Sequence, residues 1–376
     1  MTAPRSLALT VALALSAAGQ APPPPPAAVA KLAASAAAAR DAGKLDDALK
    51  LYRQALAQAP AWQEGWWQVG TIHYGRDQYP PCRDAFRRFT ALNPKLSAGF
   101  AFLGLCEFQV KEFLNSVTHL EKAVQLGLPP GEQLSDVALY HLALLHTRGA
   151  NFERALQYCV MLQKRPSPDP TLPALAGIAA LRRPIFPHEL PEADRDLAYR
   201  LGSAVLSAGA QPAAEVMAQF DEILRQYPKA ASVHYSYATF LLVNDPERGL
   251  EELKKELEIS PDHVPALVSL AFEYLRRGEP DKAKAPATKA AAFAPGSFAA
   301  RACLGRVLME SGDGELAAAI RELEAAVKLA PESPQAHFSL AAAYARAGRK
   351  QAAARERAEV TRLKKLADEA GDRFLK

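Results

Sequence analysis

Apolar residues and prolines recur along this chain with a long, regular period. Prolines follow helix-like segments at a fixed spacing: Pro60 and Pro94 are 34 residues apart, and so are Pro261 and Pro295. Within each period, apolar residues fall at the three- and four-residue intervals of an amphipathic helix. A period of this length predicts pairs of helices that cannot bury their apolar faces alone and therefore stack on one another.

A short motif repeats with the same period. Gly70 and Gly104 are 34 residues apart, and each closes a string of a large apolar residue, two spacers, an aliphatic residue and glycine. The two strings begin at Trp66 and Phe100. This pattern resembles the tetratricopeptide repeat family, whose 34-residue unit carries W-x2-L-G-x2-Y, then A-x3-F, then P. The resemblance implies an all-α fold, an α-α superhelical solenoid of helical hairpins with a concave groove.

Nine units can be phased on this motif. We expect about four of them in an N-terminal array over 29–165 and about five in a C-terminal array over 197–367, followed by a tail over 368–376. The unit over 264–297 matches the motif most completely. We expect the last unit to be closed by a capping helix over 361–370, because its outer face must tolerate water.

The N-terminal segment is predicted to be an export signal. Residues 1–18 contain one basic side chain, Arg5, then an apolar run and then small residues, which is the layout of a cleaved signal peptide. An uncleaved anchor is the alternative, although the uncharged run is shorter than the ~20 residues that span a bilayer as a helix. Residues 19–28 form a proline-rich spacer. We therefore expect an exported protein, periplasmic or extracellular, without a membrane span once the signal is removed.

One region breaks the repeat. Residues 166–196 contain seven prolines, which exclude a continuous helix. Between two proline clusters, residues 174–183 carry apolar side chains at every third position and predict one short helix. We interpret it as a lone first helix whose partner is replaced by the loop over 184–191. This insertion is either a hinge or ligand-contacting loop, or a segment packed on a neighbouring unit.

Neither the composition nor the sequence motifs indicate nucleic-acid binding, metal binding or catalysis. The net charge of +4 is too small and too dispersed to indicate nucleic-acid binding. The histidines show no metal-ligand spacing, and the sequence has no nucleophile motif or phosphate-binding loop, so we expect no catalysis, metal or cofactor. The histidines at His146, His234 and His337 stand at repeat positions that packing aromatics usually occupy, which favours core roles.

The four cysteines form no C-x-x-C motif. Free buried thiols are the favoured interpretation, because Cys82 and Cys159 stand at inward repeat positions where a small apolar residue would serve. Cys82 with Cys106 is the one pair that the packing of successive helices could bring together. Glu256 also stands at an inward position, and we expect a slight rotation of its helix to place it in water, the alternative being a buried carboxylate with a basic partner.

The resemblance also implies a binding surface. In the tetratricopeptide repeat family, positions 2, 5, 9, 12 and 13 of the first helix tend to face the concave groove. Carried onto this chain, they give as candidate groove residues Trp67, Thr71, Tyr74, Phe108, Tyr140, Arg148, Tyr235, Thr239, Phe272, Arg276, Arg306, Phe338 and Arg346. Aromatic and arginine side chains are enriched at binding hot spots, although some of these aromatics could pack instead.

These observations predict a non-enzymatic repeat scaffold that binds a protein or peptide segment in its groove, in envelope assembly or secretion. The lysine and asparagine clamp of the family's chaperone-tail binders is missing, so an acidic chaperone tail is not the expected ligand. The alternative is an accessory or regulatory subunit of an enzyme complex whose catalytic chain is separate.

Overall fold

The computed structural model describes residues 26–129 and 133–371. Across these residues the chain is all-α, without a strand, as the repeat predicts. It forms two compact units, Met1–Leu172 and Pro173–Lys376. The predicted signal over 1–18 and most of the spacer lie outside the described residues.

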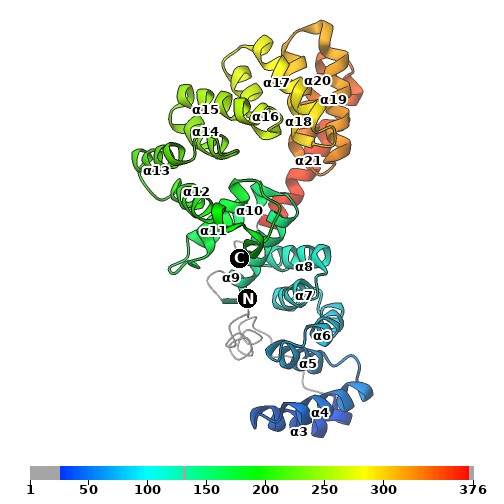
Figure 1. The fold of residues 1–376 in the computed structure, drawn as a ribbon. Helices are drawn as coiled ribbons and strands as arrows, with labels where there is room; N and C mark the ends of the chain where they lie inside the picture. The colour runs from blue at the N-terminus through cyan, green and yellow to red at the C-terminus, as the bar shows by residue number, and fades with distance from the viewer. Residues whose placement is uncertain (1–25, 130–132, 372–376) are drawn as a thin grey trace. The chain divides into compact units, whose positions relative to one another are not determined.

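The N-terminal unit is a series of antiparallel helix pairs (Figure 1). Its helices are η2 (Ala27–Val29), α3 (Ala30–Asp41), α4 (Leu45–Gln58), α5 (Gln63–Gly75), α6 (Tyr79–Leu92), α7 (Ser97–Gln109), α8 (Phe113–Gln125), α9 (Gln133–Arg148) and α10 (Phe152–Gln163). The motif glycines make the pairing close. A Cβ on Gly70 would lie 2.7 Å from the Phe86 ring, and one on Gly104 would lie 2.6 Å from Leu120, so each glycine lets the second helix of its pair approach.

The C-terminal unit continues the hairpin pattern. Its helices are α11 (Leu172–Ala180, which begins at the boundary), η3 (Pro187–Glu189), η4 (Glu192–Asp194), α12 (Arg195–Ser207), α13 (Ala213–Gln226), α14 (Val233–Asn244), α15 (Pro246–Ile259), α16 (Val264–Arg276), α17 (Pro280–Phe293), α18 (Phe298–Glu310), η5 (Asp313–Glu315), α19 (Leu316–Leu329), α20 (Pro334–Arg346) and α21 (Lys350–Gly371). The expected capping helix is not separate, because α21 runs without interruption through that segment.

The helix over 172–180 is not the lone helix that the proline pattern suggests. A Cβ on Gly177 would lie 1.7 Å from the carbonyl oxygen of Ala198, and one on Gly202 would lie 1.8 Å from that of Pro173. These contacts are possible only because both glycines lack a side chain, so α11 and α12 pack backbone against backbone. Helix α12 therefore packs against α11 as well as against α13.

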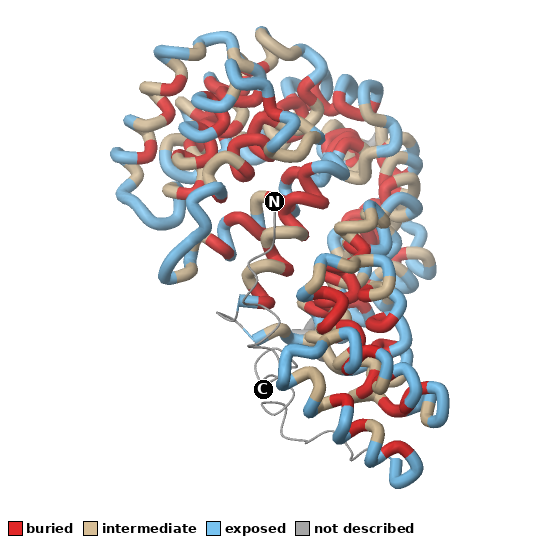
Figure 2. Tube along the Cα trace, turned by 60° about the horizontal axis from the view of Figure 1, so that its bottom comes forward, coloured by how far each residue is buried: buried red, intermediate tan, exposed pale blue. Residues whose placement is uncertain are grey.

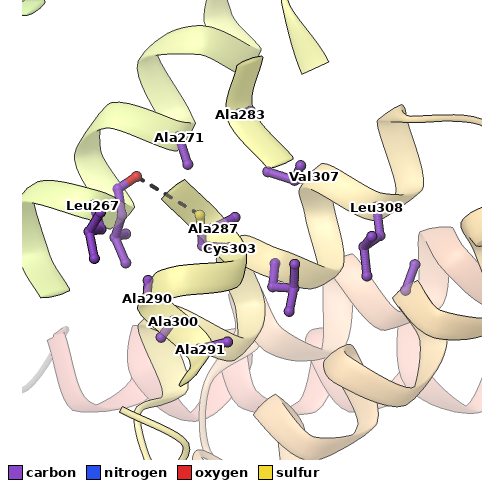
Figure 3. Close-up of a cluster of buried hydrophobic side chains, with 13 residues drawn as sticks. Leu267, Ala271, Ala283, Ala287, Ala290, Ala291, Ala300, Cys303, Val307 and Leu308 are labelled. Atoms are coloured by element: carbon purple, nitrogen blue, oxygen red, sulfur yellow. Dashed lines mark hydrogen bonds between the residues drawn. The ribbon is translucent and has the colours of Figure 1, made fainter. Parts of the chain in front are cut away.

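Small residues line the core of the C-terminal unit. Alanines of α16 and α17 meet α18 around Cys303, whose Sγ lies 3.9 Å from the carbonyl oxygen of Val268 (Figure 3). Each hairpin buries one face of its helices and leaves the other exposed (Figure 2).

Candidate functional site

The candidate groove residues divide into three groups by exposure. Six are exposed, namely Arg148, Thr239, Arg276, Arg306, Phe338 and Arg346. Five are half-buried, namely Thr71, Phe108, Tyr140, Tyr235 and Phe272. Trp67 and Tyr74 are buried, and for these two the groove assignment is wrong.

Trp67 is a core residue because aromatic side chains of two hairpins surround it. Its ring packs against Phe86 at 5.5 Å, Phe89 at 5.1 Å and Phe102 at 5.6 Å between centroids. Tyr74 packs edge-on against Phe102 at 5.1 Å, and burial raises the pKa of its hydroxyl to about 12. Neither ring is available to a ligand while this cluster is intact.

Two half-buried candidates of the N-terminal unit hold neighbouring segments together. Phe108 lies edge-on to His141 on α9, with 4.6 Å between ring centroids. The Tyr140 hydroxyl lies 2.9 Å from the Thr171 hydroxyl, just before α11. Both aromatics therefore have structural contacts on at least one side.

Tyr235 is partly covered by Arg182, which follows α11 in the proline-rich insertion. The Arg182 guanidinium lies 6.0 Å from the centroid of the Tyr235 ring, within reach of a cation–π contact. On its other side, His263 lies 4.7 Å away between ring centroids. The insertion is thus packed on a neighbouring helix at this point.

Three of the predicted residues meet in one pocket of roughly 830 Å³ in the C-terminal unit. Phe272 and Arg276 come from α16, and Arg306 comes from α18 of the next hairpin. The Arg306 guanidinium lies 5.3 Å from the centroid of the Phe272 ring. Two consecutive repeats therefore place an aromatic face and a cation side by side on the surface.

The same pocket contains residues that the sequence reasoning missed. Leu275 and Pro280 add apolar surface, and Glu310 adds a carboxylate. Glu310 stands at position 13 of its unit, the position of Arg276 in the preceding one, so the repeat rule itself would have found it. Leu275, near the end of α16, stands at position 12 of its unit, which the same rule also names. Pro280, the first residue of α17, stands at none of the rule's positions.

Charge in this pocket is partly neutralised. Arg276 donates to both oxygens of Glu273 at 2.8 and 2.7 Å, and its hydrogen bonds hold the pKa of that carboxyl below its usual value. Arg306 forms no ion pair within the described residues. Its cation is therefore the one best placed to meet an incoming acceptor.

Two further candidates lie on α20, the first helix of the next hairpin. Phe338 is 60% exposed, so its ring is largely open to solvent. Arg346 follows about two turns later on the same face, and its Nη1 donates to the backbone carbonyl of Met309 at the end of α18 at 2.5 Å. The exposed candidates of the C-terminal unit thus come from α14, α16, α18 and α20.

The histidines at the packing positions have structural roles, as predicted. His146, His234 and His337 are buried. A donor on position 4 of the first helix reaches the carbonyl of the proline six residues earlier in four units: Trp66 to Pro60, His234 to Pro228, Arg301 to Pro295 and His337 to Pro331, at 2.8 to 3.3 Å. These bonds tie each first helix to the turn before it. The described part of the chain holds no cluster of histidine, cysteine and carboxylate residues that could bind a metal.

Cys82 and Cys106 form a disulfide, so the expectation of free thiols is wrong for this pair. The two residues come from α6 and α7, which pack against one another, and their Cα atoms are 6.1 Å apart. Cys159 and Cys303 are free and buried, and burial raises the pKa of each thiol to about 12.

Glu256 lies in the protein interior, which corrects the expectation that it faces water. Its carboxylate accepts hydrogen bonds from the backbone amides of Ser232 at 2.8 Å and Tyr235 at 3.2 Å. These amides belong to the start of α14, where the first turn of a helix has no internal acceptors. Burial raises the pKa of Glu256 despite these bonds.

Comparison with known proteins locates the repeat in the sequence. The family model of the tetratricopeptide repeat matches residues 305–348, which run from α18 into the turn after α20. The described residues contain no helix that is both long and apolar enough to cross a bilayer. No curated protein matches the sequence.

Several solved structures are similar to this chain. MamA from residue 41 to its end, from Desulfovibrio magneticus RS-1, is 20% identical with a TM-score of 0.41, covering 45% of this chain and 95% of its own. YrrB, a TPR protein with an unusual peptide-binding site, is 17% identical with a TM-score of 0.38, covering 44% of this chain and 84% of its own. A chain of the APC/C hetero-tetramer Cut9-Hcn1 is 13% identical with a TM-score of 0.35, covering 90% of this chain and 79% of its own.

Proposed function

Because the chain carries the tetratricopeptide repeat in residues 305–348, we propose that it is a non-enzymatic scaffold that binds a protein or peptide segment. The binding surface is formed by α16, α18 and α20 of the C-terminal unit. The segment offers an apolar side chain to Phe272 and a carboxylate or carbonyl oxygen to Arg306.

The pocket around Phe272 and Arg306 is the observation that supports this proposal most. It joins two repeats, and it combines apolar walls with a guanidinium that lacks a carboxylate partner among the described residues. Arginine and aromatic side chains carry much of the affinity at protein interfaces, since they bury large areas with little loss of conformational entropy. Phe338 extends the same kind of surface onto the next hairpin.

The proposal also includes export of the protein from the cytoplasm. The signal-like segment over 1–18 supports a protein that acts outside the cytoplasm, in the periplasm or extracellular space, in envelope assembly or secretion. Mass spectrometry of the protein from its producing cell is expected to show a new amino terminus near Gly19. An intact Met1 on soluble protein from the cytoplasm would contradict this part of the proposal.

Peptide selection with matched variants tests the binding surface. Peptides that bind the wild-type chain are selected from a random display library, and their affinities are then measured for Arg306→Gln, Phe272→Ala and Arg321→Gln. Arg321 is an exposed arginine on α19, the second helix of its hairpin, and loses the same charge. We expect Arg306→Gln and Phe272→Ala to weaken binding by about 1 to 3 kcal/mol, and Arg321→Gln to leave it unchanged. Equal affinities for all variants would place the peptide elsewhere.

A further inference from the structure

A second pocket, of roughly 580 Å³, lies in the N-terminal unit against α4 and the end of α5. Helix α4 is the second helix of its hairpin, whereas every candidate groove residue is on a first helix. Its lining comes from α4 and from α5 and the turn after it, whereas the proposed peptide site is formed by α16, α18 and α20, so the pocket is a separate surface and nothing in the preceding proposal depends on it.

Positive charge dominates this pocket. Lys50, Arg53 and Arg76 contribute three cations to its lining, and Asp46 contributes one carboxylate. Burial lowers the pKa of His73, and the nearby Arg53 and Arg76 lower it further, so its ring is neutral at pH 7. Three positive charges and one negative charge leave the lining with a formal charge of +2.

The three cations differ in whether a carboxylate pairs with them. Arg76 donates to Asp46 at 2.5 Å, so that pair is largely neutral. Lys50 and Arg53 have no carboxylate partner within the residues that the structure describes. They are three residues apart on α4, on the same face of the helix, so one ligand can contact both.

His73 holds Arg53 in place. The Arg53 Nη2 lies 3.2 Å from His73 Nε2, and His73 Nδ1 lies 2.7 Å from Gln78 Oε1. Because a guanidinium can only donate, Nε2 is the acceptor and Nδ1 carries the proton that goes to Gln78. This bond uses one of the five N–H groups of Arg53, and the others remain for a ligand. The ring is almost fully buried, so it fixes the guanidinium at the pocket wall.

A ligand with two negative charges matches the positive charge and the hydrogen-bond donors of this pocket. A phosphate monoester carries a charge of about −1.5 to −2 at pH 7 and has three strong acceptor oxygens. An arginine fork binds phosphate through paired hydrogen bonds, and a lysine adds a mobile point charge. Leu49 and Ala57 supply apolar surface in the same pocket for the organic part of an ester.

We propose that the pocket formed by Lys50, Arg53, His73 and Arg76 binds a phosphate monoester. Lys50 and Arg53 contact the phosphate oxygens, and His73 positions Arg53. Asp46 competes with the ligand for Arg76 and limits the affinity.

Titration calorimetry with phenyl phosphate on the full chain tests this site. Arg53→Gln is expected to weaken binding on the order of tenfold, as the loss of a charge-assisted hydrogen bond does. Asp46→Asn is expected to strengthen binding several-fold, because it removes the competing carboxylate and raises the charge of the lining to +3. Arg88→Gln, at an exposed arginine of α6 outside the pocket, provides the charge-matched control and is expected to bind as the wild type does.

The ligand class is tested with two further probes. Benzoate has the same ring and a single charge, so it is expected to bind at least tenfold more weakly than phenyl phosphate. A phosphoserine peptide that binds more tightly than phenyl phosphate would identify a phosphorylated protein as the source of the ester, and weaker binding would identify a small phosphate ester. Absence of saturable phenyl phosphate binding, equal binding of benzoate, or equal weakening by Arg53→Gln and Arg88→Gln would overturn the proposal.

Discussion

His234 and Glu252 form a buried pair in which Nδ1 of the imidazole lies 2.5 Å from the carboxylate. The second ring nitrogen, Nε2, lies 3.3 Å from the backbone carbonyl of Pro228. Both ring nitrogens therefore face acceptors, an arrangement that only the protonated imidazolium can satisfy with two donated hydrogen bonds. His337 has the same environment, between Glu356 at 2.6 Å and the carbonyl of Pro331 at 2.9 Å.

The first prediction is that this pairing makes stability depend on pH. Burial alone would lower the pKa of His234, but the hydrogen bond and charge of Glu252 raise it above its ordinary value of 6.5. A raised pKa in the folded state gives a stabilisation that is complete below the unfolded pKa and lost as the pH rises through the folded one. The Tm difference between wild type and His234→Gln is thus expected to be largest near about pH 6 and to shrink by about pH 9.

His188→Gln is the control for this experiment, since His188 is an exposed histidine of the same unit. It is expected to track the wild type at every pH.

The pKa of Glu252 changes in the opposite direction: burial by itself would raise it, but the bonds to His234 and Lys255 lower it. The stabilisation of the folded state by Glu252 is therefore present above the ordinary pKa of this carboxyl and is lost as the pH falls through its lowered pKa. A Tm difference for His234→Gln that stays constant with pH would contradict the pairing.

The second prediction concerns the carboxylate that caps α14. Glu256→Ala leaves the amides of Ser232 and Tyr235 buried without an acceptor, so we expect a loss of about 1 to 3 kcal/mol in the free energy of unfolding. Glu258, two residues later, is exposed, and Glu258→Ala is expected to change stability by less than about 0.5 kcal/mol. Urea denaturation of the two variants measures both values, and equal effects would show that Glu256 does not cap the helix.

The third prediction separates core from surface aromatics. Trp67→Ala removes the centre of an aromatic cluster, and we expect it to cost about 3 to 5 kcal/mol of stability. Phe338→Ala is expected to leave stability nearly unchanged, because its ring is 60% exposed, and to weaken binding of selected peptides by about 1 to 3 kcal/mol. Thermal denaturation and peptide titration on the same preparations distinguish these outcomes. A large loss of stability in Phe338→Ala would remove it from the binding surface.

The fourth prediction concerns the disulfide between Cys82 and Cys106. It closes a loop of 24 residues, a length at which a cross-link stabilises a protein by about 3 kcal/mol. The denatured, unreduced protein is expected to show two reactive thiols, from Cys159 and Cys303, and reduction is expected to lower its Tm. Four reactive thiols before reduction would contradict the bond.

The fifth prediction tests the contact between α11 and α12. Gly177→Ala and Gly202→Ala each force a Cβ into backbone of the other helix, so we expect each to cost about 3 kcal/mol or more. Gly209→Ala, where nothing lies within 4 Å of the added Cβ, is expected to have little effect. If all three variants melt alike, the two helices do not pack in this way.

The sequence by itself determined the helical repeat. Helix formation depends on local apolar spacing, and glycines such as Gly70 are required wherever the second helix of a pair comes close. The same reasoning placed Phe272, Arg276 and Arg306 on the first helices of successive units, and the fold brings them into one pocket. For these residues, position within the repeat was enough.

Only the tertiary structure decided which residues of equivalent position are buried. Trp67 and Phe338 both stand at position 5, yet the Trp67 ring is enclosed by aromatic rings of its own hairpin and of the following one, whereas the Phe338 ring is 60% exposed. Glu256 lies on α15 and caps α14 because the first turn of α14 packs against α15, a contact between two helices. A repeat pattern fixes which side of a helix a residue occupies, whereas burial depends on what the neighbouring helix presents to that side.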